Sequence, residues 1–267
     1  MNGQYITQIE IDSLWNGHKH IRWNLEPGVN ILSGVNGVGK STILMRTVMH
    51  LLKLNEEDGV HLSFFPDEAK SVDFDVIRSF DRPIISSEFL SNVSDTKLQT
   101  ELDLHIYQLQ RKWLDYQVNL SNRMVEILTN GDPEAQTKVQ ELAHEKSDFQ
   151  DTVDELFLET GKTIKRDRNE IFFDSYGETI TPYKLSSGEK QMLIILLTVL
   201  VHNKKPFVLF TDEPEVSLHV EWQQQLLELL THLNPNAQII LTTHSPAVIM
   251  NGWGDRVTDV EDIVVKP

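Results

Sequence analysis

Cysteine is missing from this 267-residue chain, and its absence excludes several kinds of site. Without a thiol there is no disulfide, no thiolate-bound metal and no cysteine nucleophile. The absence fits a reducing compartment without requiring one. Catalytic chemistry, where present, must therefore come from other side chains.

Basic residues are scarce, because 24 Lys and Arg stand against 40 Asp and Glu, a formal net charge of -16. A surface with this balance repels phosphate backbones as a whole. A nucleic acid would have to be held by a local basic patch or by a partner. The sequence therefore leaves direct nucleic-acid binding open.

Long hydrophobic runs and a secretory signal are also missing. The longest apolar run, Met192 to Val201, is far shorter than the roughly 20 residues of a membrane-spanning helix. The first residues lack the basic and then apolar stretches of a signal peptide. We expect no membrane insertion and a cytoplasmic location. The hydrophobic content of 40% is enough for one sizeable core.

The segment Gly34–Ser41 matches the phosphate-binding pattern Gly-x-x-x-x-Gly-Lys-Ser/Thr. An apolar strand is predicted at 29–32 and a helix at 41–54, which is the context of a P-loop. Main-chain N–H groups and the helix N-terminus then face the phosphates. We expect Lys40 to reach the β- and γ-phosphates, Ser41 to bind Mg²⁺ and Thr42 to contact the α-phosphate. The predicted nucleotide-binding residues are Asn36, Gly37, Val38, Gly39, Lys40, Ser41 and Thr42.

A second apolar strand, residues 207–210, is followed by two adjacent carboxylates. Asp212 is suited to hold Mg²⁺, and Glu213 to orient or deprotonate the attacking water. An acidic turn at a strand end is the alternative. The P-loop in the same chain favours the catalytic interpretation.

The middle of the chain changes to a helical pattern. Apolar residues recur at steps of three and four from Asp95 to Ile127, Asn130–Pro133 break the pattern, and a second helical run follows to Leu156. We predict a helical hairpin over residues 95–160, inserted into a head formed by 1–94 and 161–267. A lid folded on the head and a projecting coiled coil are equally compatible with this pattern.

Two further polar segments accompany buried elements. Leu185–Gln191, which reads Leu-Ser-Ser-Gly-Glu-Lys-Gln, precedes a helix and would by itself be an ordinary capping sequence. His244 follows the apolar strand at 239–242, where a lone histidine would usually be structural. The P-loop, Leu-Ser-Ser-Gly-Glu, Asp-Glu and His motifs follow one another in this order along the chain. This order favours a functional role for the Leu-Ser-Ser-Gly-Glu segment and for His244 over a purely structural one.

These four motifs, in this order, resemble those of the ABC-class ATPases, and most of all the SMC, RecF and OLD-like branch. The resemblance implies an α/β P-loop fold with a parallel core sheet, helices on both faces and an antiparallel β layer. It implies that two heads enclose ATP and Mg²⁺ in an ATP-dependent homodimer. Ser187 and Gly188 would contact the γ-phosphate of the partner head's ATP, and His244 that of its own.

This chain differs from ABC transporter subunits at two of these motifs, and the differences favour the SMC, RecF and OLD-like branch. Transporter subunits typically read Leu-Ser-Gly-Gly-Gln and carry Leu-Asp where this chain has Leu218-His219. We therefore expect a hydrolysing ATP switch, with Glu213, His244 and Lys40 as catalytic residues. The resemblance implies that this switch controls a separately encoded nucleic-acid-linked or defence effector. An energy-coupling subunit of a transporter is the alternative.

Two parts of the pattern are incomplete. No convincing Q-loop glutamine is present, and Ser86, Ser87 or Glu88 could occupy that position after a possible strand at 83–85. No adenine-contacting residue is identified. A basic cluster, Lys162, Lys165, Arg166 and Arg168, is the best local site for an anionic partner, although a solvated turn is favoured.

Overall fold

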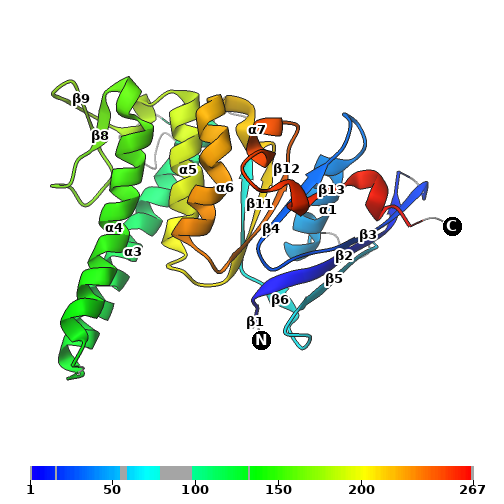
Figure 1. Cartoon of the computed structure of the whole chain (residues 1–267), viewed down its shortest axis with the longest axis horizontal. Helices are drawn as coiled ribbons and strands as arrows, with labels where there is room; N and C mark the ends of the chain where they lie inside the picture. Colours follow the sequence, from blue (N-terminus) through cyan, green and yellow to red (C-terminus); the bar gives the residue numbers. More distant parts are fainter. Residues whose placement is uncertain (1, 16, 55–58, 79–97, 132, 266–267) are drawn as a thin grey trace. The chain divides into compact units, whose positions relative to one another are not determined.

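The computed structural model describes residues 2–15, 17–54, 59–78, 98–131 and 133–265, and it shows an α/β fold. The chain divides into two compact units. One consists of Met1–Phe80 and Lys204–Pro267, and the other of Asp81–Asn203. Figure 1 follows the elements of each unit along the chain. The possible strand at 83–85 lies outside the described residues.

The first unit is built on a parallel sheet of five strands in the order β13-β4-β12-β11-β7, as the predicted fold class requires. The strands are β4 (Val29–Ser33), β7 (Phe74–Arg78), β11 (Phe207–Asp212), β12 (Ala237–Thr242) and β13 (Val257–Asp259).

Both faces of the central strands are covered. All six residues of β12 and the first five of β11 are buried, as expected for parallel strands with helices on either side. In Figure 1, α1 (Lys40–Leu51) and α6 (Val220–Leu233) lie on opposite sides of this sheet. The short helix α7 (Pro246–Ile249) follows β12 and contacts α6.

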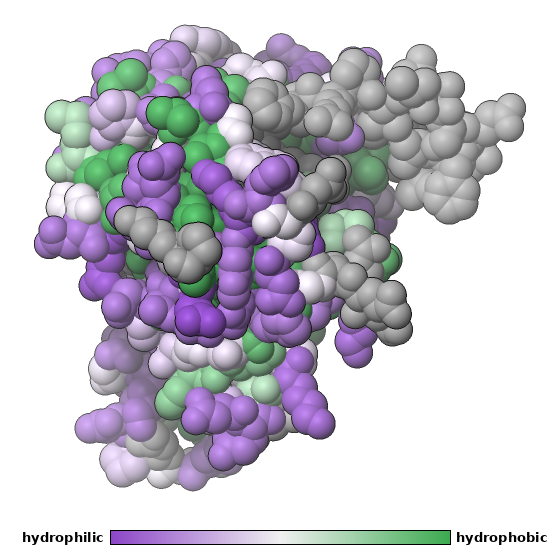
Figure 2. All heavy atoms as spheres, turned by 90° about the vertical axis from the view of Figure 1, so that its right-hand side faces the viewer, coloured by the Kyte–Doolittle hydropathy of each residue, from purple (hydrophilic) through white to green (hydrophobic). Residues whose placement is uncertain are grey.

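An antiparallel sheet of order β3-β2-β5 forms a second layer of the first unit. Its strands are β2 (Tyr5–Leu14), β3 (Lys19–Asn24) and β5 (Val60–Phe65), and a short parallel pair joins β1 (Asn2–Gly3) to β6 (Ser71–Val72). Buried residues of β2 share one hydrophobic core with Val208, Phe210 and Ile240 of the parallel sheet. On β2, Glu10 is only partly buried and binds Arg22 and His20. Figure 2 shows the molecule from the right-hand side of Figure 1, and the coloured residues of this view include many hydrophilic side chains with hydrophobic ones between them.

The second unit contains the predicted helical hairpin, α3 (Glu101–Thr129) and α4 (Ala135–Leu156), together with α5 (Ser187–Val201). The start of α3 is set by Thr100, whose side chain accepts the N–H of Asp103 in a capping box. Residues 189–200 of α5 are all buried, and from Met192 onward the helix is apolar on nearly every side. The compact unit therefore extends beyond the predicted insert of residues 95–160.

The buried side chains of the hairpin lie at its base, which is α3 up to Leu120 and α4 from Leu142 onward. Buried residues of α3 end at Leu120, and α3 contacts both α4 and α5. No residue between Ser121 and Thr129 is buried. The base thus belongs to the folded unit, whereas the last turns of α3 contribute no buried side chain.

A three-stranded antiparallel sheet completes the second unit, with β8 (Lys162–Ile164), β9 (Phe173–Ser175) and β10 (Glu178–Ile180). β9 and β10 form a β-hairpin. Tyr176 and Gly177, which connect these two strands, both have positive φ, as a two-residue hairpin turn needs. Among the described residues, no helix is long and apolar enough to cross a membrane.

Candidate nucleotide site

The segment Gly34–Ser41 connects β4 to α1, where the sequence places the P-loop. Its glycines at 34, 37 and 39 all have positive φ. At Gly39, φ is 108° and a Cβ would approach the Trp15 ring to 3.0 Å, so both the backbone and the space require glycine. Asn36 and Gly37 are exposed, whereas the side chain of Val38 is buried. The loop thus presents its main chain outward.

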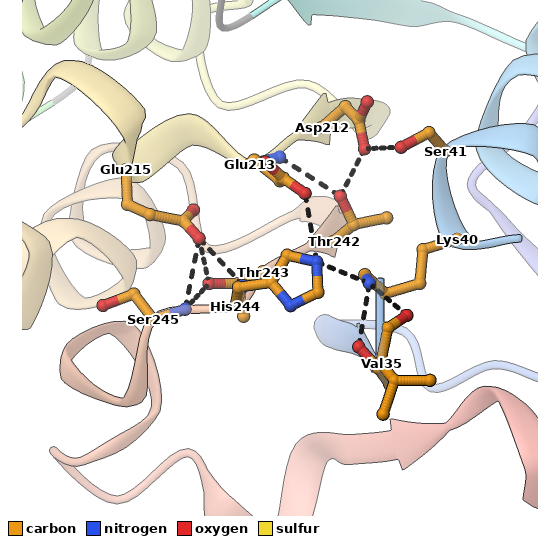
Figure 3. Close-up of polar contacts among 11 residues, drawn as sticks. Val35, Lys40, Ser41, Asp212, Glu213, Glu215, Thr242, Thr243, His244 and Ser245 are labelled. Carbon is orange, nitrogen blue, oxygen red and sulfur yellow. Dashed lines mark hydrogen bonds and ion pairs between the residues drawn. The ribbon is translucent and has the colours of Figure 1, made fainter. Parts of the chain in front are cut away.

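Lys40 lies inside this loop with only 4% of its surface exposed. Its Nζ donates to the main-chain oxygens of Gly34, at 2.9 Å, and Val35, at 3.3 Å, and lies 2.7 Å from Nε2 of His244 (Figure 3). An ammonium group surrounded by carbonyl groups at a helix N-terminus is placed to meet an anion.

Asp212, at the end of β11, lies beside Ser41 of the P-loop. Asp212 and Thr242 are paired residues at the ends of β11 and β12. The Asp212 Oδ1 accepts hydrogen bonds from Ser41 Oγ at 2.9 Å and from Thr242 Oγ1 at 2.5 Å. A hydroxyl and a carboxylate side by side are the oxygen donors that Mg²⁺ prefers. The residues at this position therefore fit the predicted ion.

Glu213 has a left-handed backbone, with φ 49°, which is unusual for a residue with a side chain. Its N–H donates to Thr242 through both the main-chain oxygen, at 3.0 Å, and Oγ1, at 3.1 Å. Its Oε1 lies 3.2 Å from Nε2 of His244, and the two side chains are 26% and 36% exposed. The predicted base and the predicted switch histidine thus face each other at an accessible position.

Glu215, which the sequence analysis did not single out, lies beneath the histidine loop and is 7% exposed. Its Oε1 accepts from Thr243 Oγ1 and from the N–H groups of His244 and Ser245 (Figure 3). The signal available in the sequence was a second acidic residue two positions after Glu213.

Trp15 is a second residue that the sequence analysis missed. It is 41% exposed, has a left-handed φ of 53°, and its ring lies against Gly39 of the P-loop. Lys19 Nζ lies 5.4 Å from the ring centroid. An accessible aromatic ring beside a phosphate-binding loop can stack on a nucleotide base. The available signal was an aromatic residue directly before Asn16-Gly17, a residue pair that is typical of turns.

In the second unit, Ser187 and Gly188 form the first turn of α5. Ser186 is the N-cap, and its capping box with Glu189 confirms the capping role considered for this sequence. Ser187 itself is exposed. Its hydroxyl is therefore not the cap, and the first N–H groups of α5 lie at the open helix end, which favours anions.

Glu189 connects this turn to the end of the hairpin. Its Oε1 accepts from Thr160 Oγ1 at 2.6 Å and from Lys162 Nζ at 2.8 Å, and its side chain is 2% exposed. Burial raises the pKa of this carboxyl, but the hydrogen bonds from Lys162, Thr160 and Ser186 together hold it below the ordinary value of 4.5.

The next residue, Lys190, makes a second buried link. Its Nζ donates to Oδ1 of Asp103 at 2.8 Å, and the two side chains are 10% and 4% exposed. Asp103 belongs to the first turn of α3, and its Oδ2 accepts N–H groups at the helix start. The first turn of α5 is thus tied to the start of α3 by Lys190 and to the segment that follows α4 by Glu189.

Three members of the predicted basic cluster have partners within their own unit. Lys162 binds Glu189, Arg166 binds Asp151 and Asp154, and Arg168 lies 5.8 Å from the centroid of the Phe172 ring. These contacts reduce the positive charge available to an anionic partner. The Q-loop positions considered, Ser86, Ser87 and Glu88, lie outside the described residues.

Comparison with known proteins agrees with these features. Residues 29–251 match the family model described as "AAA domain, putative AbiEii toxin, Type IV TA system". The chain is 24% identical to the Septu protein PtuA of Bacillus thuringiensis, over 91% of this chain and 72% of PtuA. It is also 30% identical to the retron Vc95 probable ATPase of Vibrio cholerae serotype O1 biovar El Tor, over 33% of this chain and 19% of that protein.

Among solved structures, the fold is similar to an Smc head described in its complex with the C-winged helix domain of ScpA. The TM-score is 0.52 with 12% identity, and 92% of each chain is covered. This similarity confirms the predicted SMC-like head fold.

Proposed function

The chain belongs to this AAA-domain family of P-loop ATPases, and on that premise we propose that it is an ATP-hydrolysing switch that dimerises around its nucleotide. The observation that carries the proposal is the convergence of Lys40, Ser41, Asp212, Glu213 and His244. These residues come from one helix and two strand ends of the first unit. A P-loop, a magnesium-type donor pair, a carboxylate base and a histidine are the components of phosphoryl transfer to water.

The P-loop residues bind the triphosphate. Main-chain N–H groups of Asn36–Ser41 face the phosphates, Lys40 exchanges its carbonyl partners for β- and γ-phosphate oxygens, and Thr42 contacts the α-phosphate. Ser41 and Asp212, whose side-chain oxygens are adjacent, would hold Mg²⁺. The bound ion would supply positive charge against the charge that develops on the phosphates.

Glu213 and His244 complete the reaction centre. Glu213 orients the attacking water and accepts its proton, and its carboxylate lies beside His244. His244 contacts the γ-phosphate of its own nucleotide. Trp15 stacks on the base, since its ring is accessible and borders Gly39.

A second copy supplies the remaining contacts. Ser187 and Gly188, at an open helix N-terminus, bind the γ-phosphate of the partner's nucleotide. The pairs that Glu189 and Lys190 form tie that turn to β8 and to the start of α3. A partner that displaced the hairpin would thereby displace Ser187 and Gly188.

The switch acts on a separately encoded effector in the cytoplasm, of a nucleic-acid-linked or defence type. Similarity to PtuA over most of the chain, and to a retron ATPase over part of it, favours this role over a transporter subunit. Residues 88–160, which include the hairpin, contain 15 acidic and 6 basic residues. This excess of negative charge does not favour direct contact with DNA.

Trapping the dimer tests the proposal. Glu213→Gln should lower phosphate release by about 10²-fold or more, since general bases contribute roughly that much, and should accumulate an ATP-bound dimer in light scattering. Adding Ser187→Glu should abolish that dimer by placing a negative charge against the γ-phosphate, whereas Ser121→Glu on α3 should not. A Glu213→Gln protein that stays monomeric at saturating ATP and Mg²⁺ would contradict the composite site.

A further inference from the structure

We propose that Glu215 is the positioning residue for His244: its buried carboxylate holds the loop that carries the histidine. Its Oε1 accepts three hydrogen bonds from consecutive residues, Thr243 Oγ1 at 2.5 Å, the His244 N–H at 3.0 Å and the Ser245 N–H at 3.3 Å. These donors fix the main chain on both sides of the histidine Cα. The inference rests on the proposed ATPase function.

A carboxylate is suited to this position because it can only accept hydrogen bonds and does so more strongly when charged. Glu215 is 7% exposed, so little water competes for its oxygens. Its Oε2 is buried without a hydrogen-bond partner among the described residues. Such an unsatisfied oxygen is costly, and the three hydrogen bonds that Oε1 accepts offset that cost.

Gln223 of α6 braces the same loop from the other side. Its Nε2 donates to the main-chain oxygens of Leu218, at 2.9 Å, and Glu215, at 3.3 Å, and its Oε1 accepts from Ser245 Oγ at 2.6 Å. The segment after β11 and the loop after β12 are therefore joined by two side chains. The histidine loop cannot shift without disturbing residues that directly follow Glu213.

The consequence concerns the imidazole. His244 Nε2 lies between Lys40 Nζ and Glu213 Oε1, at 2.7 and 3.2 Å. A displacement of the loop by about 1 Å would remove both contacts, and misplacement of that size can lower turnover by about 10²-fold. The hydrogen bonds that Glu215 Oε1 accepts come from Thr243, His244 and Ser245 and not from the P-loop, so its loss should act through His244 and leave the binding of the nucleotide by the P-loop intact.

A double-mutant cycle tests this path. Turnover and ATP affinity are measured for the wild type, Glu215→Ala, His244→Ala and the double variant. Glu215→Ala should lower kcat by about 10- to 100-fold, with ATP affinity by calorimetry unchanged within about twofold. The double variant should be no slower than His244→Ala alone, because the two changes remove the same function. Glu221→Ala, an exposed acid in the first turn of α6, is the matched control.

A second readout covers variants that fold poorly or lack turnover. Glu215→Gln preserves the side-chain volume, and the imidazole signal of His244 in nuclear magnetic resonance, assigned with His244→Ala, should shift in Glu215→Gln but not in Glu221→Ala. Multiplicative losses in the double variant, or an unmoved His244 signal, would overturn the positioning role. A wild-type protein without ATPase activity would contradict the proposed function instead, and the imidazole signal would still decide the role of Glu215.

Discussion

Lys40 and His244 meet through Nζ and Nε2 at 2.7 Å, although they lie 204 positions apart in the chain. An ammonium group can only donate, so Nε2 must accept, and the ring carries its proton on Nδ1. The same Nε2 then cannot donate to Glu213 Oε1, 3.2 Å away. A triphosphate that draws Lys40 to its own oxygens would release Nε2 for Glu213 or for the γ-phosphate.

Replacing Lys40 should weaken nucleotide binding itself. Lys40→Ala removes charge-assisted hydrogen bonds worth about 1.5–3 kcal/mol, so the ATP Kd should rise by about 10- to 100-fold in calorimetry. Lys70→Ala, at an exposed position of the same unit, is the control. Equal ATP affinity in both variants would remove the lysine from the proposed role.

Trp15 should affect recognition of the base and not of the phosphates. Stacking of a base on an aromatic ring is worth about 1–3 kcal/mol, so Trp15→Ala should raise the ATP Kd by about 5- to 100-fold. Binding of inorganic triphosphate should be nearly unchanged, and Trp15→Phe should restore most of the ATP affinity. A parallel loss for ATP and triphosphate would mean that Trp15 supports the P-loop and does not contact the base.

The fold class and the main motifs could be predicted from sequence because each depends on a local pattern. The strand before Gly34, the helix after it and the apolar run before Asp212 are contiguous segments whose periodicity survives in the structure. The hairpin was also predicted. Its start at Glu101 depends on a capping interaction of Thr100, which apolar spacing does not report.

The missed residues depend on tertiary pairing. Glu215 reaches His244 only because β11 and β12 pair in the register that aligns Asp212 with Thr242. Trp15 borders the P-loop only because its backbone is left-handed. Neither relationship has a signature in a window of neighbouring residues. The composite arrangement of Ser187 and Gly188 with a partner's nucleotide remains a prediction.

The buried pair of Lys190 and Asp103 should matter for stability. Lys190→Met leaves a buried carboxylate uncompensated, which costs about 3–5 kcal/mol, and the denaturant midpoint should fall accordingly. Adding Asp103→Asn should recover part of the loss, because the amide oxygen still accepts hydrogen bonds at the helix start. The exposed pair of Lys184 and Glu178 is the control, and Lys184→Met should cost at most about 1 kcal/mol. Equal midpoints for Lys184→Met and Lys190→Met would contradict burial of the first pair.

The carboxyl of Glu189 should make the free energy of unfolding depend on pH in the acid range. Its pKa in the folded protein lies below the ordinary value of 4.5, so its contribution is fully present above that value and is lost as the pH falls toward the folded pKa. The free energy of unfolding, measured by denaturant titration from pH 7 downward, should decline less steeply below about pH 4.5 in Glu189→Gln than in the wild type. Glu159→Gln, an exposed neighbour, should follow the wild type. Parallel curves for the wild type and Glu189→Gln would rule out this role of the carboxyl.

The hydroxyl of Thr242 bonds both Asp212 and Glu213, so the two acids reach their positions only when β11 and β12 have paired. Thr242 Oγ1 donates to Asp212 and receives the N–H of Glu213, and all three residues lie where β11 and β12 end side by side. Slippage of this strand pair by one position would turn the side chains of one strand to the opposite face and separate the acids from their support. A nascent chain that has not yet reached residue 242 would therefore lack the support of Asp212 and Glu213 and would not hydrolyse ATP.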